Sequence, residues 1–149
     1  MGGLKTEFPM VLTQDLVWSD MDAFKHVNNA IYFRYFENAR IAYFEQVGLI
    51  AHKEETQIGP ILASTSCNFR APLTFPDTIQ IGARIESIRP KTFRMKYAVY
   101  SEGLDCLAAE GEGLIVFYNY DLGKSCEIPA EIVTAVNALQ KGKFTCRSL

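Results

Sequence analysis

The sequence WSDMDAFKHVNNAIYFRYFENARIAYFEQVG, which runs from Trp18 to Gly48, decides the fold of this chain. Its first part carries two acids, a histidine and two asparagines, and its second part repeats apolar residues at helical spacing. Asn28 and Asn29 are suitable N-cap residues, and Gly48 is a suitable stop. The pattern therefore predicts one long helix that ends near Val47.

The predicted helix is apolar over most of its circumference. Its clearly polar stripe consists of three residues: Arg34, Asn38 and Glu45. A helix of this kind is normally buried in a protein or embedded in a membrane, and its charges exclude the membrane. We expect the helix to be wrapped on most sides, with Arg40, which falls inside the apolar arc, either paired to Glu37 one turn earlier or hydrogen-bonded at an interface.

The rest of the chain reads mainly as β-strands separated by turn signals. A polar linker containing His52 to Glu55 should follow the helix, with no second helix until Glu131 to Gln140. The expected strands are Val11 to Trp18, Ile61 to Arg70, Thr78 to Ile88, Phe93 to Ser101 and Cys106 to Tyr118. Their short connections indicate antiparallel neighbours. The sequence thus predicts a single α+β domain over residues 1–149, in which an antiparallel sheet of about five strands surrounds the long helix.

Composition excludes several classes of function. The chain has 149 residues, of which 48% are hydrophobic and 21% charged, and a formal net charge of only -2. This balance provides no general attraction to nucleic acid or to an anionic membrane surface. Neither a signal peptide nor a run long enough to span a bilayer is evident, so we expect a cytoplasmic protein. The four cysteines are too widely spaced for a zinc motif, and we expect no metal.

The residues ahead of the long helix are the candidate reaction site. The unpaired amide N–H groups of a first helical turn point back toward the loop that carries Asp20 and Asp22. Such donors polarise a carbonyl group or bind an anion. A carboxylate beside them supplies a base or a nucleophile.

The motif from Asp20 to Arg40 resembles that of the hot-dog-fold acyl-CoA thioesterases, and the 4-hydroxybenzoyl-CoA thioesterase group is the most similar. Weaker similarities extend over most of the chain, including Phe69 to Pro72 and the Arg89 to Thr92 turn. The resemblance implies a hot-dog fold, with an antiparallel sheet wrapped around a central helix and a short C-terminal helix. It also implies homodimers with a continuous sheet, which often pair into homotetramers, and active sites at the dimer interface.

The resemblance assigns roles to individual residues. Asp22 is the implied catalytic carboxylate, as nucleophile or general base, and the backbone N–H at or near Asn29 polarises the carbonyl. His26 would orient the carboxylate or a water molecule. Some subgroups place their carboxylate on the central helix, which makes Glu37 the alternative. Lys25 stands where relatives commonly have glycine, a residue suited to positive φ.

The resemblance also implies the substrate. The turn with Arg89, Lys91 and Thr92 would contact the nucleotide end of coenzyme A, although the same residues could be solvated charges on an outer face. We expect hydrolysis of an acyl-CoA, or acyl-carrier-protein, thioester to free acid and thiol, with no cofactor besides the coenzyme A of the substrate. The alternative is a non-catalytic hot-dog protein that binds acyl thioesters or forms an oligomeric scaffold.

Overall fold

The fold was analysed in a computed structural model that describes residues 3–140. Its elements are, in order, β1 (Met10–Asp15), a short 3-10 helix η1 (Trp18–Asp20), α1 (Asn29–Gln46), α2 (Leu49–Thr56), β2 (Ile58–Phe69), β3 (Thr78–Ile88), β4 (Thr92–Ser101), β5 (Cys106–Asn119), β6 (Lys124–Ser125) and α3 (Ala130–Gln140). The expected strands and the two expected helices all occur, and their bounds differ from the expected ones by a few residues at most.

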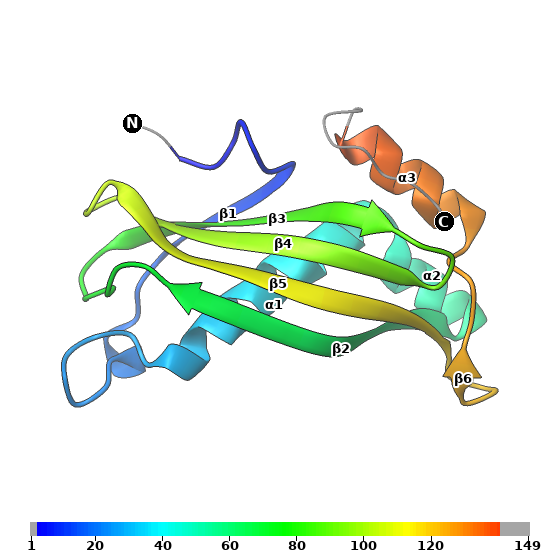
Figure 1. Cartoon of the computed structure of the whole chain (residues 1–149), viewed down its shortest axis with the longest axis horizontal. Helices are drawn as coiled ribbons and strands as arrows, with labels where there is room; N and C mark the ends of the chain where they lie inside the picture. The colour runs from blue at the N-terminus through cyan, green and yellow to red at the C-terminus, as the bar shows by residue number, and fades with distance from the viewer. Residues whose placement is uncertain (1–2, 141–149) are drawn as a thin grey trace.

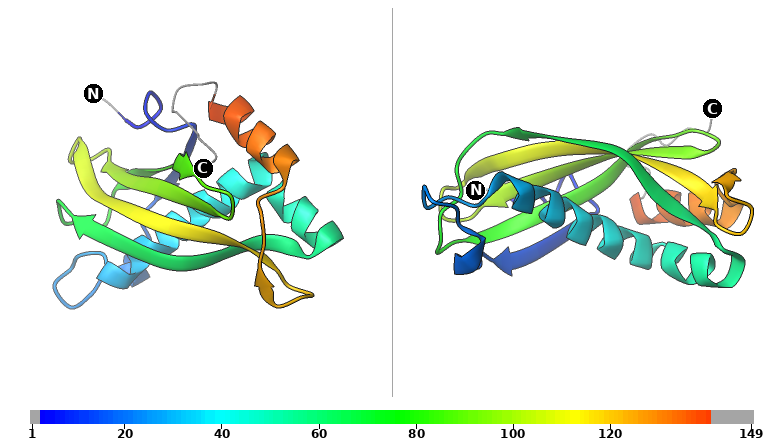
Figure 2. Two further views of the ribbon diagram at one scale, coloured as in Figure 1. Left: turned by 45° about the vertical axis from the view of Figure 1, so that its right-hand side comes forward. Right: turned by 90° about the horizontal axis from the view of Figure 1, so that it is seen from below.

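The main sheet has the strand order β1-β3-β4-β5-β2, with the two-residue strand β6 attached to β5. Every pair of neighbouring strands is antiparallel. Helix α1 lies across one face of this sheet (Figure 1), and the turned views show the sheet curling over the helix (Figure 2). The α+β hot-dog architecture expected from the sequence is confirmed.

Alternation along β3 and β4 builds the core between sheet and helix. The inward residues of these two strands are at most 1% exposed: Ile79, Ile81, Ala83, Ile85, Phe93, Met95, Tyr97 and Val99. Across from them, the ring of Phe36 on α1 stacks on Tyr97 with 4.9 Å between ring centroids. Each such side chain contributes roughly 1.5–3 kcal/mol when it leaves water. The apolar face of α1 is therefore fixed against the centre of the sheet.

Helix α1 is less enclosed than its composition predicts. Phe33 and Ile41 are 36% and 40% exposed, so the chain buries only one face of the helix. Of the two expected accommodations of Arg40, the ion pair with Glu37 does not form, because the Arg40 guanidinium turns inward and donates a hydrogen bond to the Tyr97 hydroxyl at 3.2 Å. Within residues 3–140, no helix combines the length and the apolar character needed to cross a membrane.

Residues expected to form a polar linker instead form α2. Gly48, with φ of +80°, ends α1 and redirects the chain into this second helix. Only Leu49 is fully buried there, and it anchors a helix whose other side chains are at least partly exposed. A two-turn helix with a single buried residue has no apolar periodicity, which explains why the sequence pattern did not reveal it.

Helix α3 completes an edge of the sheet through one buried side chain. The pairing of β1 with β3 stops at Ala83. Farther along β3, the side-chain amide of Gln140 makes the hydrogen bonds that a neighbouring strand would otherwise make. Its oxygen accepts the Ile85 N–H at 2.8 Å and its nitrogen donates to the Ile85 carbonyl at 3.2 Å. The Tyr43 hydroxyl of α1 donates to the same oxygen at 2.7 Å. Gln140 thus joins α3, α1 and β3.

Replacing Gln140 by leucine should lower the free energy of unfolding by about 2–3 kcal/mol, because it leaves the buried N–H and C=O of Ile85 without partners. Urea unfolding followed by circular dichroism measures the loss. Asn137→Leu, at an exposed position of the same helix, serves as the control. Equal midpoints for the two variants would show that Gln140 does not hold this edge.

Candidate functional site

The loop between η1 and α1 is a closed structure fixed at several points. Met21 and Val27 form an isolated antiparallel bridge across it. The Asp22 N–H donates to the His26 carbonyl at 2.7 Å, and the Val27 N–H donates to the Leu73 carbonyl at 2.9 Å. The loop is therefore attached to the segment that follows β2 and cannot move independently of the sheet.

The Asp22 side chain organises this loop from inside. Its Oδ1 atom accepts the backbone N–H groups of Phe24 at 2.8 Å and His26 at 3.2 Å. Lys25 adopts φ of +65°, the left-handed conformation that glycine would adopt more readily. The loop thus accommodates a lysine at a glycine-like position, at a local cost of about 1 kcal/mol.

The second oxygen of Asp22 is open. Among residues 3–140, no group donates a hydrogen bond to Oδ2. The residue lies in an open hollow whose other lining residues are Trp18, Ser19, Met21, Lys25, Thr74 and Phe75. One oxygen therefore fixes the orientation of the carboxylate, and the other is available to a bound molecule.

The start of α1 provides an unused donor. The Asn28 side chain caps the helix by accepting the Ala30 N–H at 3.0 Å, and the Asn28 N–H donates to the Asp20 carbonyl at 3.0 Å. The N–H of Asn29 meets no acceptor in the part of the chain that the structure describes. A free N–H at the positive end of an 18-residue helix can polarise a carbonyl oxygen.

Asn29 opens into a second hollow beside the first. Its other lining residues are His26, Val27, Tyr32, Phe69, Arg70, Ala71 and Pro72. The structure therefore brings His26 and Asn29 together and places Asp22 in the neighbouring hollow, with the loop that joins Asp22 to His26 between them. The three residues expected to be catalytic belong to one compact region.

The residues expected to bind the nucleotide lie elsewhere in the chain. Arg89 and Lys91 lie in the β3–β4 turn and Thr92 begins β4, at the opposite end of the sheet from the Asp22 loop (Figure 1). The 11 residues of β3 separate the two ends, a span of about 35 Å at the usual rise of a strand. One chain by itself does not bring this turn to Asp22.

The alternative carboxylate, Glu37, is also separate from the loop. It lies on the exposed side of α1, eight residues beyond Asn29, which corresponds to about 12 Å along a helix. It lines neither of the two hollows.

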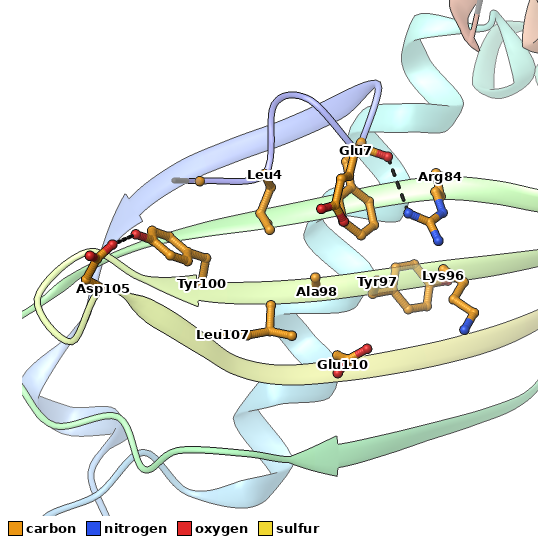
Figure 3. Close-up of a pocket in the computed structure, with 12 residues that line it drawn as sticks. Leu4, Glu7, Arg84, Lys96, Tyr97, Ala98, Tyr100, Asp105, Leu107 and Glu110 are labelled. Atoms are coloured by element: carbon orange, nitrogen blue, oxygen red, sulfur yellow. Dashed lines mark hydrogen bonds between the residues drawn. The ribbon is translucent and has the colours of Figure 1, made fainter. Parts of the chain in front are cut away.

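A third hollow lies on the outer face of the sheet, under the N-terminal segment (Figure 3). Several of its polar groups already have partners. Arg84 pairs with Glu86 at 2.8 Å and donates to the Glu7 carbonyl at 3.4 Å, and the Tyr100 hydroxyl donates to Asp105. Leu4, Phe8 and Ala98 form a small second core beneath it. We therefore interpret this hollow as a gap beside the packing of the N-terminal segment on the sheet, and we assign no ligand to it.

Cysteine thiols and clusters of metal-binding side chains are the other candidates for chemistry. Burial raises the pKa of Cys67 to about 11, so this thiol is protonated at neutral pH and is a poor nucleophile. Cys106 and Cys126 are free as well, and Cys146 lies outside the described residues. Between residues 3 and 140, no three His, Cys, Asp or Glu side chains gather as a metal site.

One residue near the site was not identified from the sequence. Tyr35 is 2% exposed, and its hydroxyl has no hydrogen-bond partner among the described residues. Burial raises the pKa of Tyr35, and the Asp20 carboxylate of the neighbouring loop raises it further. In the sequence, a tyrosine at helical spacing predicts a core residue. No sequence pattern distinguishes the Tyr35 hydroxyl from that of an ordinary core tyrosine.

Comparisons with known proteins identify the family and the fold of this chain. The family model described as the thioesterase-like superfamily matches residues 16–136. A thioesterase from Thermus thermophilus, solved in complex with coenzyme A and Zn, is 27% identical, with a TM-score of 0.79 over 90% of this chain and 96% of that chain. The PA5185 protein of Pseudomonas aeruginosa PAO1 is also 27% identical, with a TM-score of 0.79 over 90% and 93% of the two chains.

A further relative comes from Bacillus subtilis strain 168. This uncharacterized protein, YsmA, is 25% identical over 122 residues, which cover 81% of this chain and 80% of YsmA. The similarity therefore extends over most of the length of both proteins.

Because of the buried Tyr35 hydroxyl, we expect a mutation at this position to stabilise the protein, whereas most core mutations destabilise. Tyr35→Phe should raise the free energy of unfolding by about 1 kcal/mol, because it removes a buried hydroxyl that lacks a partner. Tyr43→Phe, on the same helix, should instead lower it by about 1 kcal/mol, since its hydroxyl donates to Gln140. Thermal unfolding measures both variants, and a loss of stability in Tyr35→Phe would reveal a partner for that hydroxyl.

Proposed function

Because this chain belongs to the thioesterase-like superfamily and is a thioester hydrolase, we propose that it cleaves an acyl-CoA at the Asp22 loop. The observation that carries the proposal is the combination of the Asp22 carboxylate, fixed through Oδ1 and open at Oδ2, with the free Asn29 N–H at the helix start. Thioester hydrolysis needs one group of each kind.

The mechanism assigns one task to each group. The Asn29 N–H binds the carbonyl oxygen of the thioester and stabilises the negative charge that develops there, a contribution of about 3 kcal/mol for one such donor. Asp22 removes a proton from water, whose oxygen adds to the carbonyl carbon. The C–S bond then breaks, the acid is released, and the departing thiolate takes up a proton. Direct attack by Asp22 gives the same products through an anhydride, which water then hydrolyses.

His26 supports this chemistry from the second hollow. Its backbone is fixed on both sides by Asp22, and its side chain lines the same hollow as Asn29. In the proposed mechanism, the imidazole orients the water molecule or the Asp22 carboxylate.

The proposed substrate is a coenzyme A ester because the 27% identical Thermus thioesterase was solved with coenzyme A. In this chain, Arg89, Lys91 and Thr92 are the proposed contacts for the nucleotide. Arg89 and Lys91 are exposed, and the turn is held by the Arg89 N–H, which donates to the Thr92 carbonyl at 2.9 Å. An acyl-carrier-protein thioester is the alternative substrate.

A homodimer would place this turn at the end of the sheet that carries Asp22. Strand β2 is one of the two outermost strands of the main sheet, and residues 61–66 along it are exposed. A long unpaired edge invites another strand. Two copies that pair antiparallel through β2 form one continuous sheet, in which the β3–β4 turn of one copy and the Asp22 loop of the other lie at the same end. Two such dimers could pair as a tetramer.

The proposal of a non-catalytic binder or scaffold has less support. A lysine at the glycine-like position would mark a lost active site if it distorted the loop. Instead, Lys25 adopts the left-handed conformation, and the loop closes around Asp22. No feature of the described residues favours the binder over the enzyme.

Asp22→Asn tests the proposed carboxylate. The amide oxygen can still accept the N–H groups of Phe24 and His26, so the loop should keep its shape while the base is lost. We expect thiol release from a panel of short, long and aromatic acyl-CoAs to fall by about 10²–10⁴-fold. Asp20→Asn is the matched control and should keep its activity.

Other outcomes of this experiment have distinct meanings. Unchanged turnover in Asp22→Asn would move the base to another residue, with Glu37→Gln as the next variant. Equal acyl-CoA binding by the parent and Asp22→Asn, with no turnover by either, would support the binder. Turnover of acyl-carrier-protein thioesters alone would correct the substrate.

The dimer proposal predicts the effect of charge on the free edge. Ile61→Lys combined with Leu62→Lys should convert a dimer into a monomer, because edge lysines oppose strand pairing, and should abolish thiol release. Light scattering after gel filtration measures the mass. Leu122→Lys, at a position that is 67% exposed in the β5–β6 turn, is the control. A parent protein that is monomeric and active would contradict the proposal.

A further inference from the structure

The hollow that contains Asp22 has aromatic walls that the chain leaves uncovered. Trp18 is 71% exposed and Phe75 is 41% exposed, and Met21 lies with them along the same hollow. Large apolar side chains grouped beside a reactive group indicate a binding surface. The walls suit the hydrocarbon part of a small acyl group.

The same hollow has one cationic side chain. Lys25 lines it together with Asp22, and the Lys25 N–H donates to the Asp22 carbonyl at 3.0 Å, which closes the turn between the two residues. In the described part of the chain, the Lys25 ammonium forms no ion pair. The other polar groups of the lining are the hydroxyls of Ser19 and Thr74.

These charges have opposite consequences for a negatively charged ligand. The Asp22 carboxylate alone would repel an acyl group that carries its own carboxylate, whereas an ammonium at the same hollow offsets that repulsion and attracts the anion. The left-handed backbone at residue 25 is better suited to glycine, so the lysine stands there at a local conformational cost.

From this arrangement we infer that Lys25 is a specificity-determining residue that selects short acyl groups ending in a carboxylate. The inference rests on the proposed function, and it adds the substrate class. The thioester carbon lies at Asp22, the methylene chain packs against Trp18 and Phe75, and the terminal carboxylate pairs with the Lys25 ammonium. Monothioesters of short dicarboxylic acids have this chemistry.

The test compares glutaryl-CoA with pentanoyl-CoA, which have the same chain length and differ in the terminal carboxylate. The quantity measured is the ratio of their kcat/KM values, in which any common effect of a mutation on Asp22 cancels. Lys25→Gln should lower the glutaryl-to-pentanoyl ratio about fivefold, the upper size expected for an exposed ion pair. Lys25→Glu should lower it further, and Lys25→Arg should preserve it.

Lys53→Gln is the matched control because the Lys53 ammonium lies over the Tyr120 ring, away from the Asp22 loop. It should leave the ratio unchanged. Turnover of both esters with the same ratio in the parent, Lys25→Gln and Lys25→Glu would overturn the inference and leave the proposed function intact. Turnover of no acyl-CoA by the parent would overturn the proposed function and the inference together.

Discussion

The packing of α1 against the inner face of the sheet is the contact on which the rest of this structure depends. The helix approaches β5 so closely that a Cβ atom on Gly111 would lie 2.3 Å from the Phe36 ring. Phe36 in turn stacks on Tyr97 of β4, and Tyr97 accepts a hydrogen bond from Arg40. A glycine, two rings and one guanidinium thus fix the distance between the helix and the sheet.

The position of α1 determines where chemistry can occur. Because the helix is fixed along the sheet, its N-terminus lies beside the loop that precedes it, and the Asn28 N–H joins the two through the Asp20 carbonyl. The loop is also tied to Leu73. The backbone that carries Asn29 and Asp22 is therefore tied to the rest of the fold, which in the proposed mechanism would leave less ordering to the substrate. The same rigidity positions Lys25.

The surface of the chain is consistent with a second copy. The exposed edge of β2 and the exposed side chains of Phe33 and Ile41 on α1 leave apolar area uncovered, and the proposed nucleotide contacts lie at the far end of the sheet from Asp22. In the proposed dimer, a second copy would be the means of covering part of this area.

The sequence by itself determined the long helix, the five long strands and the loop of Asp22, because each has a strong periodic or capping pattern. It could not reveal α2, whose only fully buried residue is Leu49, nor the inward turn of Arg40 to Tyr97, which lies 57 residues away. Only the tertiary structure decided that, among residues 3–140, the Asn29 N–H and the Tyr35 hydroxyl have no partner, and that Lys25 shares a hollow with Asp22. These properties depend on contacts between distant segments, and spacing along one segment does not record such contacts.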